Sequence, residues 1–188
     1  VTLRTYTHVS LFRSRWRCTA ASAQPADRPT SPDFLYLLGR ASPEPTASEA
    51  AFREALHLDP THARAWTGLA AVQRGQGKVE DAAMTYRKAL SFSPALSEAW
   101  AGLRAVSMMK NDGAGLAAVS LEAIAAAPQD PQSWLAAAAT NPGQASTLLD
   151  QALRIHPSQP ELVLARARAA FEDKDWDLAA TVYQTALN

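Results

Sequence analysis

Residue types that could support catalysis or metal binding are few in this chain. The histidines are His8, His57, His62 and His156. They show no metal-ligand spacing, and three of them lie at or beside helix ends expected near Pro60 and Pro157. We therefore interpret the histidines as solvated residues between structural units.

Two short segments have part of the pattern of a ligand-binding loop. In residues 173–177, aspartates alternate with Lys and Trp as in a calcium loop, but the required glycine and the closing glutamate are missing. Residues 75–78 lack the full spacing of a phosphate loop, and they lie between two expected helices rather than after a strand. No nucleophile, base and orienting group stand out together. We expect no catalytic, metal or cofactor site and no enzymatic activity.

Large apolar residues and prolines recur at a fixed period instead. Trp66, Trp100 and Trp134 are 34 residues apart, as are Pro60, Pro94 and Pro128. Residues 63–96 have the pattern of two amphipathic helices joined by a glycine turn, with a tryptophan near the start and a proline after the end. A fixed period of this length indicates a helical solenoid, in which each unit packs on its neighbours.

The residues at equivalent positions resemble the tetratricopeptide repeat pattern. They are Trp66, Leu69, Ala82, Tyr86, Ala89 and Pro94 in the best unit, and Trp100, Trp134, Ala179, Tyr183 and Ala186 in the others. The small alanines allow two helices to approach closely, and the large rings fill the remaining space. The resemblance implies an all-α, right-handed solenoid of about five antiparallel helix pairs over residues 32–188. Its units would span about 32–60, 61–94, 95–128, 129–157 and 158–188.

The fourth unit is shorter than the others. Trp134 and Pro157 are 23 residues apart, whereas Trp66 and Pro94 are 28 apart. Residues 141–143, Asn-Pro-Gly, must therefore turn the chain early, and we expect the first helix of this unit to be clipped.

Residues 1–31 form a separate segment, a basic Ser/Thr/Arg-rich arm followed by a proline-rich linker. Residues 1–28 carry five basic residues and one acidic residue, so the rest of the chain has a net charge of −4. The basic side chains that define the arm are Arg4, Arg13, Arg15 and Arg17. This composition is typical of an organellar transit peptide. A basic tail that binds a partner, and a strand or helix docked on the body, are the alternatives.

Composition and hydropathy predict a soluble protein. No apolar run approaches the ~20 residues that a membrane-spanning helix needs. The single cysteine, Cys18, excludes an internal disulfide. We expect a cytoplasmic or organelle-matrix location.

The resemblance implies a scaffold that binds a peptide or helix of a protein partner in its concave groove, as part of a larger assembly. The first helix of each unit would line this groove. The inward residues would be Arg64, Thr67, Ala71, Arg74, Glu98, Ala101, Ala105, Met108, Gln132, Leu135 and Ala139. The Lys, Asn and Arg set with which some relatives bind chaperone tails is absent. A nucleic-acid complex subunit that uses the basic arm, and the repeat portion of a longer enzyme, are the alternatives.

Overall fold

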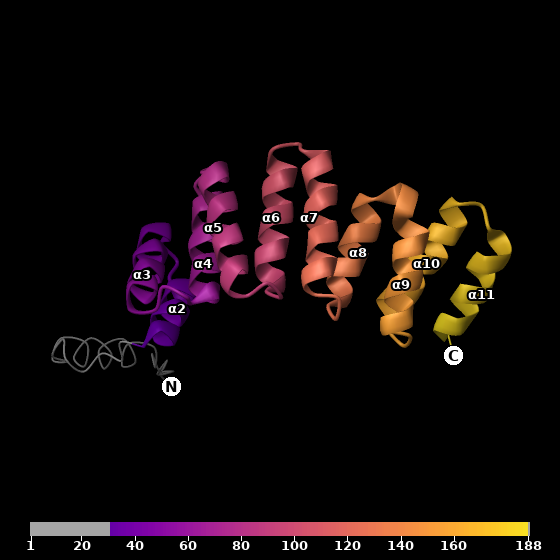
Figure 1. Ribbon diagram of the computed structural model, residues 1–188, viewed down its shortest axis with the longest axis horizontal. Helices are drawn as coiled ribbons and strands as arrows, with labels where there is room; N and C mark the ends of the chain where they lie inside the picture. Colours follow the sequence, from indigo (N-terminus) through magenta and orange to yellow (C-terminus); the bar gives the residue numbers. More distant parts are fainter. Residues whose placement is uncertain (1–30, 188) are drawn as a thin grey trace, which may run out of the picture.

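The computed structural model describes residues 31–187, without the side chains from residue 185 onward. In this part of the chain, helices follow one another in a right-handed solenoid of five antiparallel pairs, and there is no strand (Figure 1). The all-α repeat architecture expected from the sequence is confirmed. The basic arm lies outside the described residues.

The first helix of each pair is α2 (Pro32–Ala41), α4 (Ala63–Gly75), α6 (Ser97–Met109), α8 (Pro131–Thr140) and α10 (Pro160–Glu172). The second helix is α3 (Pro45–Leu58), α5 (Val79–Phe92), α7 (Gly113–Ala126), α9 (Ala145–Ile155) and α11 (Trp176–Leu187), and a 3-10 turn, η2 (Pro142–Gln144), precedes α9. Each helix packs on the next one in sequence. First helices also meet across pairs, α2 with α4, α4 with α6, and α8 with α10.

The periodic tryptophans hold successive units together in the same way each time. The indole N–H of Trp66 donates to the carbonyl of Pro60 at 2.8 Å. The indole N–H of Trp100 donates to the carbonyl of Pro94 at 2.7 Å, and that of Trp134 donates to the carbonyl of Pro128 at 2.8 Å. In each case the proline precedes the tryptophan by six residues. Each bond ties a first helix to the end of the preceding pair, which explains why Trp and Pro recur with one common period.

Aromatic rings of the second helices reach the next first helix where that helix has a glycine. The Tyr86 ring on α5 is 2 % exposed, and a Cβ on Gly102 of α6 would lie 2.2 Å from its ring carbon. The Phe52 ring on α3 is 3 % exposed, and a Cβ on Gly39 of α2 or on Gly68 of α4 would lie 2.7 or 2.5 Å from its nearest ring carbon. The core is therefore a row of such contacts along the solenoid, with separate apolar clusters rather than one centre.

The turns inside three pairs share a left-handed residue at the equivalent position. Gly77 has φ 77°, Asn111 has φ 52° and Lys174 has φ 63°. Glycine has no steric cost there, and asparagine tolerates this region, whereas a lysine has a side chain that opposes it.

Replacing Lys174 by glycine is therefore expected to raise the free energy of unfolding by about 0.5 to 1 kcal/mol, because the relief of backbone strain exceeds the added freedom of the unfolded chain. Urea denaturation followed by circular dichroism measures the change. Lys78→Gly is the matched control, since Lys78 has φ −80° and gains nothing from glycine. Equal losses of stability in both variants would contradict the explanation.

The fourth pair is clipped as the spacing of Trp134 and Pro157 predicts. Helix α8 has 10 residues, whereas α4, α6 and α10 have 13 each. The chain turns through η2 directly afterwards. Compared with α10, helix α8 therefore lacks about one turn at its C-terminal end.

Candidate partner-binding groove

The inner surface of the solenoid is hollowed near its N-terminal end. A groove of about 530 Å³ lies between α2, the start of α3 and α4, and Glu98 of α6 closes one side. We call it the N-terminal groove. Its lining includes Tyr36, Arg40, Phe52, Arg64, Thr67, Gly68, Ala71, Val72 and Glu98.

The floor of the N-terminal groove is apolar and fixed. Phe52 approaches Gly39 and Gly68 so closely that no larger residue fits beside its ring. Tyr36 packs at a tilt on Phe52, with ring centroids 6.1 Å apart. Side chains that are already packed lose little conformational freedom when they bind a ligand, so this floor is preorganised for an apolar side chain.

The rim of the N-terminal groove carries separated charges. Arg40 lies over the Tyr36 ring, 5.9 Å from its centroid, and donates a long 3.4 Å hydrogen bond to the Tyr36 hydroxyl. Arg64 and Glu98 are exposed, and within residues 31–187 neither has an ion-pair partner. A segment lying in the groove would meet guanidinium groups and a carboxylate around an apolar centre.

Buried polar groups continue along the inner helices beyond the N-terminal groove. Burial raises the pKa of the Tyr86 hydroxyl, and the nearby Arg74 guanidinium opposes the shift. Burial lowers the pKa of Arg104, and the Asp130 carboxylate opposes that shift. The Nε atom of Arg74 and the Nη1 atom of Arg104 are buried and have no hydrogen-bond acceptor among the described residues. Both atoms are shielded from solvent, so they do not form part of the exposed binding surface.

The expected groove residues separate into three groups in the structure. Arg64, Thr67, Ala71 and Glu98 line the N-terminal groove. Leu135 and Ala139 line a second cleft, described below. Arg74, Ala101, Ala105, Met108 and Gln132 lie on the same first helices but line neither of these two hollows.

Sequence reasoning missed the contributions of α2, α3 and α10. Tyr36, Arg40 and Phe52 line the N-terminal groove, although only α4 and later first helices were expected to do so. Val163 of α10 stands where the earlier units have tryptophan, and the same spacing counted from it would have identified Leu164 and Phe171 as inward positions. The spacing of the inward positions in the middle units, extended to the first helices of both terminal units, could have found these residues.

The signature residues pack as their types require. Leu69, Ala82, Tyr86, Ala89, Trp100, Trp134 and Ala179 are buried. Trp66 is half-buried, Pro94 is exposed at its turn, and Tyr183 on α11 is 41 % exposed. The side chain of Ala186 lies outside the described part. The described signature side chains are therefore enclosed except for Trp66, Pro94 and Tyr183.

This repeated geometry agrees with comparison to known families. The family model described as "Tetratricopeptide repeat" matches residues 44–97 and 131–187, more than half of the chain. The chain belongs to the tetratricopeptide repeat family. A comparison with curated proteins found no match.

Solved structures with the same fold include several tetratricopeptide proteins. PilF of Pseudomonas aeruginosa is 21% identical, with a TM-score of 0.61 over 81% of this chain and 73% of that one. MamA from Desulfovibrio magneticus RS-1 is 13% identical, with a TM-score of 0.59 over 83% and 93%. YrrB, described as a TPR protein with an unusual peptide-binding site, is 15% identical, with a TM-score of 0.57 over 94% and 91%. At these identities the similarity establishes the fold alone.

The histidine interpretation is wrong for His62, which is a structural residue of this tetratricopeptide solenoid. Its side chain is 11% exposed. Its Nδ1 accepts from the Ala65 amide at 3.0 Å and so caps α4. Its Nε2 lies 3.0 Å from an Asp33 carboxylate oxygen. A ring that accepts at Nδ1 carries its proton on Nε2, so this tautomer donates to Asp33 and ties α2 to α4.

The acidic turn and the remaining candidate sites also have structural roles. Asp175 accepts from the Leu178 amide at 3.1 Å, which caps α11. In residues 31–187, no group of His, Cys, Asp and Glu side chains is arranged to hold a metal ion. None of the described helices is long and apolar enough to cross a membrane. Arg4, Arg13, Arg15 and Arg17 lie outside the described residues.

Proposed function

We propose that the protein is a non-enzymatic scaffold that holds a peptide or helical segment of a protein partner in the N-terminal groove, as part of a larger assembly. The observation that carries this proposal is the preorganised apolar floor of Tyr36 and Phe52, surrounded by the exposed side chains of Arg64 and Glu98, which form no ion pair within residues 31–187. Recognition sites for peptides commonly combine a fixed apolar pocket with a few polar groups that set register.

Two further observations support this function. Thr67 and Ala71 on α4 have small side chains, so a partner backbone can approach the inner surface closely. A solved relative by fold, YrrB, is described as having a peptide-binding site. The tetratricopeptide repeat family is in general one of interaction scaffolds, which is consistent with a protein ligand.

The test blocks the N-terminal groove without touching the core. Ala71 is exposed in the groove, so Ala71→Trp fills it while α4 keeps its buried face. Proteins captured by the wild-type chain from its own cells are identified, and synthetic peptides from them are titrated by calorimetry. We expect Ala71→Trp to raise the peptide Kd at least tenfold, about 1.4 kcal/mol.

The matched control is Ala50→Trp, because Ala50 is exposed on α3 outside the groove lining. It should leave the Kd unchanged, and both variants should keep the wild-type circular dichroism spectrum. Equal affinity of the Ala71→Trp variant and the wild type would overturn the proposal.

A further inference from the structure

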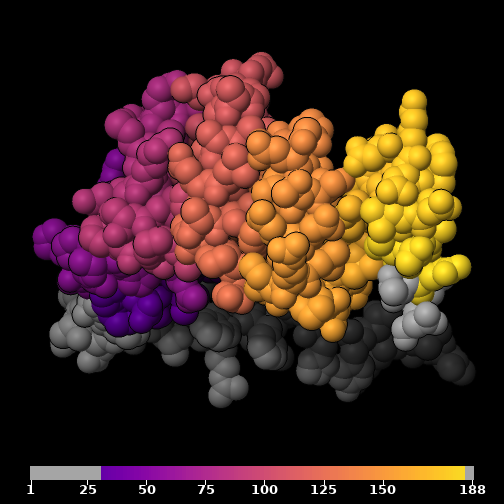
Figure 2. Space-filling model, turned by 45° about the vertical axis from the view of Figure 1, so that its right-hand side comes forward, coloured from indigo at the N-terminus to yellow at the C-terminus, as the bar shows by residue number. Residues whose placement is uncertain are grey.

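A second docking surface lies at the other end of the inner face, and it arises from the clipped fourth pair. Because α8 ends at Thr140 whereas α10 continues to Glu172, a cleft of about 360 Å³ opens between α8, the start of α9 and α10. We call it the C-terminal cleft. In Figure 2 the surface dips between the orange fourth pair and the yellow fifth pair.

The C-terminal cleft has a narrow apolar lining. Its walls include Leu135, Ala138, Ala139, Ala145, Ala165 and Ala169. Two helices can lie close together where small side chains meet, so this lining accommodates a helix at the place where the missing turn of α8 would have been. The only charged residues of the lining, Arg168 and Glu172, form an ion pair with each other at 2.9 Å.

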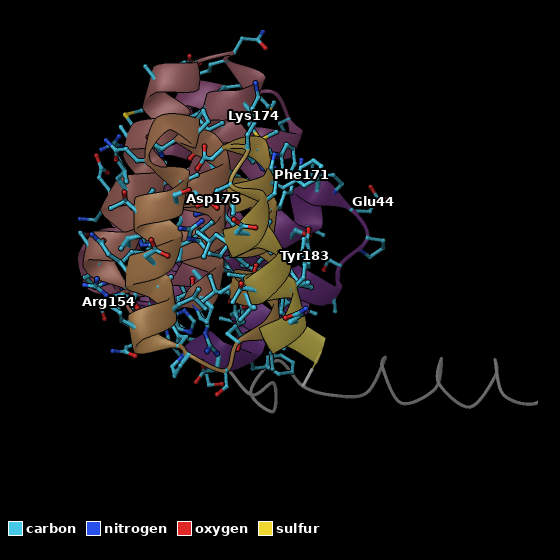
Figure 3. All side chains as sticks on the ribbon, turned by 90° about the vertical axis from the view of Figure 1, so that its right-hand side faces the viewer. Glu44, Arg154, Phe171, Lys174, Asp175 and Tyr183 are labelled. Atoms are coloured by element: carbon cyan, nitrogen blue, oxygen red, sulfur yellow. The ribbon has the colours of Figure 1, made fainter. Side chains whose placement is uncertain are left out.

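An exposed aromatic patch adjoins the C-terminal cleft. It consists of Leu164, Phe171 and Trp176, which are 48%, 56% and 56% exposed. The Phe171 and Trp176 rings meet edge to face, with centroids 4.8 Å apart. Figure 3 views this end of the molecule and shows Phe171 on the same side of α11 as Tyr183. Clustered exposed aromatic side chains of this kind mark interaction sites.

The exposure of Phe171 follows from its position in the repeat rather than from its place in the last pair. Arg40, Arg74 and Met108 occupy the equivalent position in pairs that are followed by further helices. Arg40 and Met108 remain exposed, and Arg74 is half-buried. A following helix pair would cover the face of α11 that is turned away from α10 and would leave the inner position of Phe171 open.

The charge around the aromatic patch defines the partner. The end of α10, the turn after it and the start of α11 carry Glu172, Asp173, Asp175 and Asp177 against a single lysine, Lys174. Residues 31–96 carry seven acidic and seven basic residues, whereas residues 97–188 carry ten acidic and six basic ones. The acidic excess of the solenoid is therefore confined to the half that contains the cleft. It attracts a basic partner and repels an acidic one.

We propose that the C-terminal cleft and the aromatic patch bind a basic amphipathic helix of a partner protein. The apolar face of that helix lies along the alanine-lined cleft and ends against Phe171 and Trp176, and its Lys or Arg side chains meet the acidic turn. This site is separate from the N-terminal groove, so it stands independently of the function proposed there. The solenoid then holds two segments at once, one at each end of its inner face.

The test uses the full chain and two defined probes. Both are end-capped, fluorescein-labelled 18-residue peptides with leucines at helical spacing, one with lysine and one with glutamate at all other positions. We expect the lysine peptide to bind with a Kd that rises with salt concentration and the glutamate peptide not to bind. Fluorescence anisotropy measures both. Equal binding of the two peptides, or no binding of the lysine peptide, would overturn the proposal.

Variants then locate the binding. The double change Phe171→Ala with Trp176→Ala should raise the Kd of the lysine peptide at least tenfold. Met84→Ala is the matched control, because Met84 is 64% exposed on α5, away from the cleft. Ala71→Trp, which fills the N-terminal groove, should leave this Kd unchanged, so failure of one proposal is distinguishable from failure of the other. Wild-type affinity in the double variant would overturn the assignment.

The aromatic patch could instead bind a second copy of this chain. Sedimentation of the purified protein, without any peptide, distinguishes this self-association from binding of a basic helix. A wild-type dimer that dissociates when Phe171 and Trp176 are replaced would assign the aromatic patch to self-association and overturn the proposal. A monomer in both cases leaves the patch free for the basic helix and supports it.

Discussion

Replacing Trp100 by alanine is expected to lower the free energy of unfolding by about 3 to 5 kcal/mol, as large aromatic deletions in cores do. The side chain is 7% exposed and packs in the largest apolar cluster, which α4, α5, α6 and α7 share. Its loss leaves a cavity at the junction of two pairs. It also removes the indole donor from the Pro94 carbonyl. Urea denaturation, followed by circular dichroism, measures the loss as a lower midpoint.

Two controls separate the parts of this effect. Trp100→Phe keeps most of the buried ring but loses the 2.7 Å hydrogen bond, and we expect it to cost about 1 to 2 kcal/mol. Trp176→Ala makes the same change at a side chain that is 56% exposed, and its cost should stay below about 1 kcal/mol. An equal cost for Trp100→Ala and Trp176→Ala would show that Trp100 does not join the two pairs.

The change Gly102→Ala should destabilise the protein by about 1 to 3 kcal/mol, although glycine to alanine inside a helix ordinarily stabilises it. The added methyl group would lie 2.2 Å from the ζ carbon of Tyr86. That ring is 2% exposed and has no free volume to enter, so the two helices must separate. Thermal and urea denaturation report the loss.

A double-mutant cycle tests this mechanism. Leucine at position 86 has no atoms where the tip of the tyrosine ring lies, so Gly102→Ala should cost almost nothing in a Tyr86→Leu background. Gly75→Ala is the matched control, because nothing lies within 4 Å of a Cβ there. It should be neutral or slightly stabilising. Additive costs of the two changes at 86 and 102 would contradict a direct clash.

The two proposed sites have a common origin in departures from the regular repeat. The N-terminal groove forms where Gly39 and Gly68 let Phe52 reach the inner surface. The C-terminal cleft forms where α8 is three residues shorter than α4, α6 and α10. A regular repeat encloses its own core, so binding surfaces arise where a side chain or a helical turn is missing.

The sequence by itself determined the helices, their pairing and the family. Trp66, Trp100 and Trp134 mark one packing position, and the constant distance to the preceding proline reflects one repeated hydrogen bond. Local spacing is sufficient for this because each unit contacts only its neighbours. The distance from Trp134 to Pro157 likewise indicated the shortened α8.

Only the tertiary structure decided which surfaces remain open. His62 was interpreted as solvated, but the helix packing places its ring between the amide of Ala65 and the carboxylate of Asp33. The spacing marks Tyr86 and Tyr183 alike as signature rings of second helices, yet one is 2% and the other 41% exposed. The physical reason is that exposure depends on the distance between neighbouring helices, which side chains from several units set together and which no single unit encodes.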